Sequence, residues 1–191
     1  FTTFFLVLIL LSIFYDFLET KALKVTYVEA MGQRYLVRDV EDKKEAALLL
    51  GNIVKNLTKL VEHLDKEKNN LKTNNKDIER LKENFRPNAI SESSPGNKFT
   101  SYSINKGEKI VFCLRSKKDS NKLMDLNTMM FVAIHEMAHL MTKEIGHPPV
   151  FWDNMKFLLE EAIKIGVYKK QEFNKNPVDY CGMKITDTPL D

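Results

Sequence analysis

The spacing of apolar and polar residues changes several times along the chain, and each change predicts a secondary-structure element. Residues 24–38 are rich in β-branched and aromatic side chains on both sides of a Met-Gly-Gln turn, which predicts a β-hairpin. Residues 42–63 instead repeat apolar side chains at steps of three and four, as a long amphipathic helix does. Alternation returns over residues 99–115 around an Asn-Lys-Gly connection at residues 105–107, and this pattern predicts a second hairpin.

The C-terminal half of the chain favours helices. A helix is expected to begin at Asp125 or Asn127, both good N-caps, and its apolar side chains cover nearly the whole circumference. This predicts a buried central helix that ends before Gly146. Residues 150–165 predict a further helix, and a short one is expected over residues 77–85. The tail reads as mostly irregular, so the predicted fold class is α+β, with the central helix packed on a short β-sheet.

The N-terminal segment is the most apolar part of the chain. Residues 4–15 contain a single polar side chain, and Asp16 follows directly. A spanning helix needs about 20 apolar residues, so residues 1–18 are marginal, and a buried core helix is the alternative. We expect an N-terminal membrane anchor over residues 1–18 and one further domain over residues 24–191. Basic residues at positions 21, 24, 34 and 38 favour the cytosolic side for that domain.

Composition narrows the possible partners and the redox state. The 191 residues carry 29 Lys and Arg against 26 Asp and Glu, a net charge of only +3. This balance disfavours a dedicated nucleic-acid binder, which usually shows a concentrated basic face. The two cysteines, Cys113 and Cys181, are too few for a disulfide framework. We expect two free thiols in a reducing compartment rather than a bridge.

A cluster of histidines carries the candidate chemistry. The sequence His135-Glu136-Met137-Ala138-His139 lies in the predicted central helix, where residues four apart share one face. The two imidazoles can therefore bind one zinc ion, and Glu136 can take a proton from the water that the metal activates. His147 follows Gly146, where the chain is expected to turn back toward the helix. Burying these polar side chains without a partner would be costly, which favours a metal site over ordinary core histidines.

The third metal ligand has two candidates at this stage. His147 is one, approaching the ion from outside the helix. The other is a carboxylate of the next helix, because Glu160 and Glu161 stand about twenty residues after His139, where gluzincins place their glutamate ligand. We favour His147, and the glutamates then remain candidates for hydrogen bonds to the imidazole N–H groups.

The order of these residues resembles a known family. His-Glu-Met-Ala-His, a further Gly-His and then Phe151-Trp152 are similar to the zincin metallopeptidases, and within them to the WLM and SprT (Spartan)-like group. Similar sequences occur in large DNA viruses and their algal hosts, with a like tail around Tyr-Cys-Gly. The match covers residues 129–162, and the spacing from His139 to His147 departs from several zincin families. The resemblance implies zinc held by His135, His139 and His147, with Glu136 as the general base.

Together these features predict a zinc-dependent metallopeptidase that hydrolyses proteins or peptides near a membrane surface. Tyr102 or Tyr180 is a candidate donor to the oxyanion, although packing roles are common for tyrosines. Cys181 is a weaker candidate for a place near the metal. One alternative is a zinc-stabilised interaction module with little turnover, against which the intact Glu136 argues. The other is a Spartan-like protease of DNA-associated proteins, which the missing basic patch disfavours.

Overall fold

The computed structural model describes residues 2–22, 24–71, 75–116 and 122–191. Its elements follow in the order α1 (Thr2–Ala22), β1 (Val25–Ala30), β2 (Gln33–Arg38), α2 (Lys43–Glu67), α3 (Asn75–Asn84), a 3-10 turn (Pro87–Ala89), β3 (Ile90–Glu92), β4 (Ser101–Ile104), β5 (Lys109–Phe112), α4 (Leu126–Met141), α5 (Pro149–Lys164), β6 (Val178–Tyr180) and β7 (Met183–Ile185). The mixed α+β class is as predicted, and so are both hairpins and the helices of the main domain.

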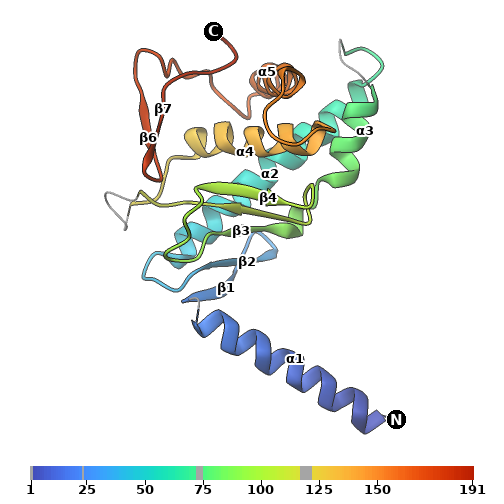
Figure 1. The fold of residues 1–191 in the computed structure, drawn as a ribbon, viewed down its shortest axis with the longest axis vertical. Coiled ribbons are helices and arrows are strands. Elements are labelled where there is room, and N and C mark those ends of the chain that lie inside the picture. The colour runs from blue at the N-terminus through green and yellow to red at the C-terminus, as the bar shows by residue number, and fades with distance from the viewer. Residues whose placement is uncertain (1, 23, 72–74, 117–121) are drawn as a thin grey trace.

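The strands form three small sheets, and α2 and α4 pack against the first two. β1 pairs with β2, and β3, β5 and β4 form a sheet in that order, with β3 parallel to β5 and β4 antiparallel to it. Helix α4 contacts α2, α3, α5 and β4, and therefore lies at the centre of the helical layer (Figure 1). Its residues are almost all buried, as the apolar circumference predicts. The parallel strand β3 was missed, because residues 91–97 look like a polar loop in the sequence.

A buried ion network explains how polar residues come to lie in β3. The carboxylate of Glu92 accepts the Nε–H of Arg115 at 2.8 Å and the backbone N–H of Arg38 at 2.7 Å. Arg38 ends β2 and Arg115 follows β5, so the network joins the first hairpin to the three-stranded sheet. A buried carboxylate needs such partners, since leaving it unpaired would cost several kcal/mol. The sequence alone does not reveal this pairing.

The C-terminal segment holds the first correction. It is mostly irregular, as predicted, but β6 and β7 form a short hairpin within it, with Cys181 and Gly182 at the turn. The expectation of two free thiols was wrong, because Cys113 and Cys181 form a disulfide. Cys113 directly follows β5, so the bond ties this hairpin to the central sheet. The two cysteines are 68 positions apart, and only the folded chain brings them together.

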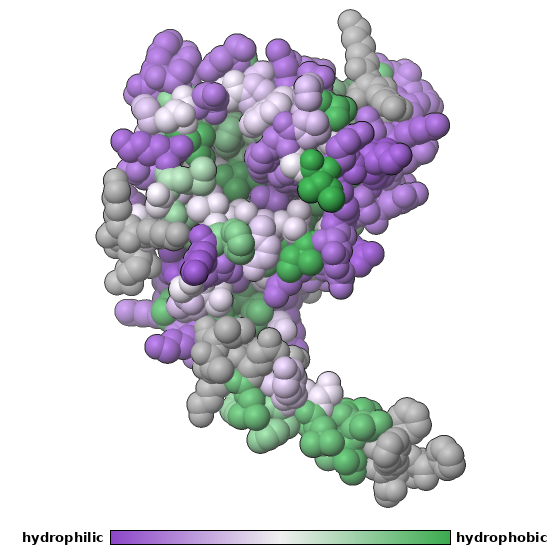
Figure 2. Space-filling model, in the orientation of Figure 1, coloured by the Kyte–Doolittle hydropathy of each residue, from purple (hydrophilic) through white to green (hydrophobic). Residues whose placement is uncertain are grey.

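The second correction concerns the N-terminal helix. The large apolar side chains of α1 between Leu6 and Leu18 are exposed and form the apolar, green extension of Figure 2. The predicted membrane anchor, and with it the membrane-associated location on the cytosolic side, is contradicted. Among the residues that the structure describes, no helix is long and apolar enough to cross a bilayer. The physical reason is that the apolar run of α1 stops at Asp16, short of the required length.

Candidate active site

Helix α4 places the first two histidines. Its N-terminus is capped by Asp125, whose carboxylate accepts the backbone N–H of Thr128 at 2.9 Å. From there the helix runs to Met141, and His135 and His139 extend from the same face, one turn apart. Their ring centroids lie 4.9 Å apart, as the spacing of the motif predicts.

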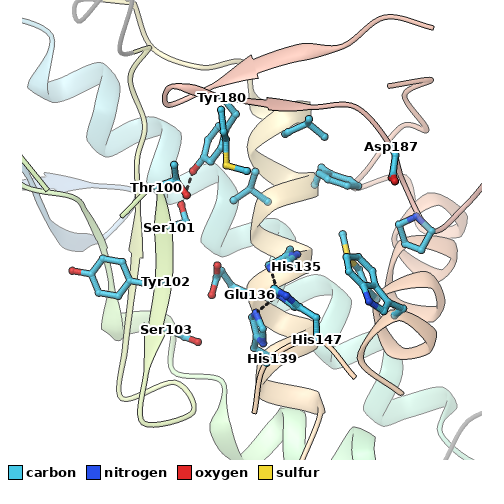
Figure 3. Close-up of a pocket in the computed structure, with 18 of the residues that line it drawn as sticks. Thr100, Ser101, Tyr102, Ser103, His135, Glu136, His139, His147, Tyr180 and Asp187 are labelled. Atoms are coloured by element: carbon cyan, nitrogen blue, oxygen red, sulfur yellow. Dashed lines mark hydrogen bonds between the residues drawn. The ribbon is translucent and has the colours of Figure 1, made fainter. Parts of the chain in front are cut away.

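His147 completes the cluster from outside the helix. After α4 the chain turns at Gly146, whose φ of +82° suits glycine. The Nε2 atom of His147 then lies 3.2 Å from that of His135 and 3.1 Å from that of His139 (Figure 3). Three nitrogens around a tetrahedral zinc, each at 2.0–2.1 Å from the ion, would be about 3.3 Å apart. The three imidazoles therefore have the geometry of a metal site.

Phe151 forms the base of this cluster. It is fully buried, and its ring centroid lies 5.0 Å from that of His135 and 4.5 Å from those of His139 and His147. Trp152 packs beside His147 at 5.5 Å and stays 44% exposed. The aromatic pair that follows the third histidine thus holds the imidazoles in place, which a flexible side chain would do less well.

The surroundings favour neutral imidazoles. Burial, together with the neighbouring histidines, lowers the pKa of His135 to about 3. Burial, together with His147 and Lys106, lowers the pKa of His139 to about 4. At neutral pH both rings therefore keep a free lone pair, which is the form that binds a metal ion.

Glu136 lies beside the cluster and is only 4% exposed. Burial raises the pKa of its carboxyl to about 7, although a hydrogen bond from Ser103 opposes the shift. A carboxyl group that titrates near neutrality can both accept and return a proton. Ser103, on β4, was not singled out in the sequence, because nothing in its local pattern indicates that β4 faces α4.

The alternative metal ligands lie elsewhere. The carboxylate of Glu161 is paired with the His63 Nε2 of α2 at 2.9 Å and with Lys164, and Glu160 is exposed on α5. The group of side chains that could hold a metal consists of His135, His139 and His147 within the part of the chain that the structure describes. The structure therefore brings the three histidines together and leaves both glutamates outside.

Of the two tyrosines considered, only Tyr180 approaches the cluster. Tyr102 points away from the histidines in Figure 3, and its hydroxyl accepts a hydrogen bond from Asn97. Tyr180 comes from β6 and shares a hydrogen bond with the hydroxyl of Ser101 on β4. Burial raises the pKa of the Tyr180 phenol well above its usual range, opposed by Ser101 and reinforced by Glu136. Cys181 contributes no free thiol, because it is disulfide-bonded.

Lys106 is a further residue that sequence reasoning missed. Its ammonium group donates to the backbone oxygens of His139 at 3.1 Å, Thr142 at 2.7 Å and Glu144 at 2.9 Å. These carbonyls lie at and just beyond the end of α4, where helical carbonyl groups lack intrahelical partners. The lysine thus fixes the segment that leads to His147. The only signal for it was its place in the turn of the second hairpin.

The cluster lies in a cleft with a volume of about 770 Å³. One side is formed by β4 and the following turn, the base by α4, and the other side by α5 and residues 180–189. Figure 3 shows the labelled serines of β4 and Asp187 of the C-terminal segment on opposite sides of the histidines. A cleft of this size accommodates several residues of an extended peptide.

Several known proteins are similar to this chain in sequence or in fold. Protein R325 of Acanthamoeba polyphaga mimivirus is 32% identical over 97% of this chain and 94% of its own length. Protein 136R of Invertebrate iridescent virus 6 is 29% identical over 85% of this chain and 86% of its own. The crystal structure of Wss1 from Saccharomyces cerevisiae has a similar fold, with a TM-score of 0.50 and 18% identity, over 68% of this chain and 86% of Wss1.

The family relationship rests on the sequence. The WLM domain matches residues 36–189, which include the β4–β5 hairpin, α4 with its histidines and the cysteine-linked C-terminal segment. This match covers well over half of the chain and agrees with the resemblance seen in the motif and the residues that follow it. The chain belongs to the WLM domain family.

Proposed function

We propose that this chain is a zinc-dependent peptidase, with its catalytic domain over residues 24–191. The observation that carries the proposal is the convergence of three imidazole nitrogens next to a buried carboxylate in an open cleft. Membership of the WLM family and the Wss1-like fold support it. A purely structural zinc site needs four closed ligands and no neighbouring acid, whereas a catalytic site has three ligands and an open position.

The residues present fit zinc. His135, His139 and His147 would hold the ion, because neutral imidazole is a preferred zinc ligand and the spacing of their nitrogens suits tetrahedral coordination. When bound, zinc would supply a Lewis acid that makes a water molecule more acidic and polarises the scissile carbonyl group.

Glu136 would move the proton. Its carboxylate takes a proton from the attacking water and later gives it to the leaving amine, a sequence that a pKa of about 7 suits. Ser103 donates a hydrogen bond to the carboxylate and thereby orients it. Because the group is almost fully buried, bulk water competes little for either proton transfer.

We assign the oxyanion donor to Tyr180 rather than Tyr102. The backbone N–H of Cys113 donates to the hydroxyl oxygen of Ser101 at 3.3 Å, which leaves the hydroxyl proton of Ser101 free to point toward Tyr180. Tyr180 then accepts from Ser101 and keeps its own phenolic proton for the cleft, which it lines. A fixed donor aimed at developing charge is worth several kcal/mol in such a site.

The decisive experiment compares the wild type with Glu136→Gln. Zinc content is measured by elemental analysis, and turnover is measured with casein and unstructured peptides. We expect equal zinc in both proteins and a fall in turnover of about 10²–10⁴-fold in the variant, the usual contribution of a general base. Glu160→Gln serves as the matched control, because the same change on the exposed face of α5 should leave both zinc content and turnover unaltered.

The same measurements decide against the proposal if they come out differently. Equal zinc and no cleavage by either protein would favour an interaction module that uses the metal for stability. Undiminished cleavage by Glu136→Gln would point to another base. If the wild type contained no stoichiometric zinc even after reconstitution, a zinc-dependent reaction would be ruled out.

A further inference from the structure

The two sides of the cleft differ in polarity. The β4 side contributes hydroxyl groups, including those of Ser101 and Ser103. The opposite part, between the start of α4, α5 and the β6–β7 hairpin, is lined by apolar side chains, namely Phe131, Val132, Met155, Met183, Ile185 and Pro189. Thr186 and Asp187 are the polar residues of this part, whereas hydroxyl groups line the side that faces Glu136.

The apolar part begins one helical turn from the metal ligands. Phe131 and Val132 precede His135 by four and three positions, so they share its face, about 5.4 Å further along α4. Met155 follows Phe151 by four positions and is therefore displaced by one turn along α5 in the same way. Both helices therefore contribute apolar side chains to the cleft that holds the histidine cluster.

The C-terminal hairpin closes this space from a third direction. Met183 and Ile185 are two positions apart on β7, so both side chains lie on one face of the strand, and both line the cleft. Lys184, between them, is exposed, does not line the cleft and belongs to the other face. Asp187 lines the rim of the cleft just after the strand (Figure 3). Its negative charge would disfavour an acidic side chain at this point.

We propose that this apolar end of the cleft is the specificity subsite of the enzyme, and that it binds a large apolar side chain next to the scissile bond. The proposal rests on the peptidase function above. In an extended peptide, the residue beside a reacting carbonyl group places its side chain roughly one helical turn, about 5 Å, away. Leucine, methionine and phenylalanine would fill the space, alanine would leave it partly empty, and aspartate would lose its hydration beside Asp187.

The first test is cleavage. Zinc-loaded wild type digests a mixture of unstructured peptides, mass spectrometry identifies the cleavage sites, and matched synthetic peptides then carry leucine, alanine or aspartate at the enriched position. We expect kcat/KM to be at least about 10-fold higher for leucine than for alanine, the usual range for apolar discrimination, and lowest for aspartate. Ile185→Ser should reduce the leucine-to-alanine ratio severalfold, whereas Lys184→Ser, on the opposite face of the same strand, should leave it unchanged.

The second test is binding without turnover. Trp152 is the single tryptophan of the chain, is 44% exposed and lines the cleft, so its fluorescence reports on bound peptides. In Glu136→Gln, the leucine peptide should bind about 10-fold more tightly than the alanine peptide. Equal affinities, or a preference that Ile185→Ser does not alter, would overturn the subsite. Preferential binding with no cleavage by the wild type would instead overturn the peptidase function and leave the subsite standing.

Discussion

Removal of the disulfide between Cys113 and Cys181 tests how the C-terminal wall of the cleft is held. Both residues are almost fully buried, so we choose Cys113→Ala with Cys181→Ala, since serine would bury two hydroxyl groups that need partners. Tyr180 stands next to Cys181, and its hydroxyl is paired with Ser101 on the central sheet. Loss of the bond should therefore affect both the stability of the fold and the position of Tyr180.

The magnitude follows from the length of the chain that the bond closes. The cysteines are 68 positions apart, and the loop entropy removed from the unfolded state by a loop of that size corresponds to about 4 kcal/mol at 25 °C. This is a large part of the total stability of an ordinary domain, which is about 5–15 kcal/mol. For a protein of this size, the melting temperature should fall by roughly 8–16 °C.

The assay is urea unfolding monitored by circular dichroism, with the wild type measured both oxidised and reduced. Each single alanine variant should behave like the double variant, because either one breaks the bond. Activity at a temperature where the variant is still folded should also fall, since the hairpin that carries Tyr180 is held less firmly. A loss of less than about 1 kcal/mol in the double variant would refute the entropic argument, and unchanged activity would show that the hairpin is held by its noncovalent contacts.

The remaining predictions concern single residues. His147→Ala should weaken zinc binding by at least about 100-fold, as judged by competition with a chelator, whereas Glu161→Gln should not, and the reverse result would make Glu161 the ligand. Tyr180→Phe should lower kcat about 10²–10³-fold with little change in KM or melting temperature. Tyr102→Phe should leave kcat unchanged. Equal effects of the two substitutions would show that Tyr180 is not the oxyanion donor. Gly107→Ala should destabilise the fold by about 2–4 kcal/mol in urea unfolding, because φ is +99° and the added Cβ would lie 2.2 Å from a backbone oxygen of α3. A loss below about 1 kcal/mol would mean that the turn relaxes without difficulty.

Local patterns in the sequence determined most of the secondary structure and half of the site. The repeat of apolar residues fixes α2 and α4, and the alternation fixes both hairpins, because helix and strand periods depend on near neighbours in the chain. The pairing of His135 with His139, and the place of Glu136 beside them, follow from the same helical geometry. Gly146 predicted the turn toward His147. It did not decide whether that histidine or a glutamate of α5 is the third metal ligand.

The tertiary structure decided what depends on contacts between distant segments. Glu161 is occupied by His63, Tyr180 rather than Tyr102 faces the cluster, and Cys113 meets Cys181 across 68 positions, none of which leaves a signal in local spacing. Strand β3 forms although its sequence is polar, because it pairs with β5 and because Glu92 within it is held by a buried ion network. Propensity and periodicity depend on residues that are close together in the sequence. The side chains of the cleft come from distant segments, and only the packed core brings them within a few ångströms of one another.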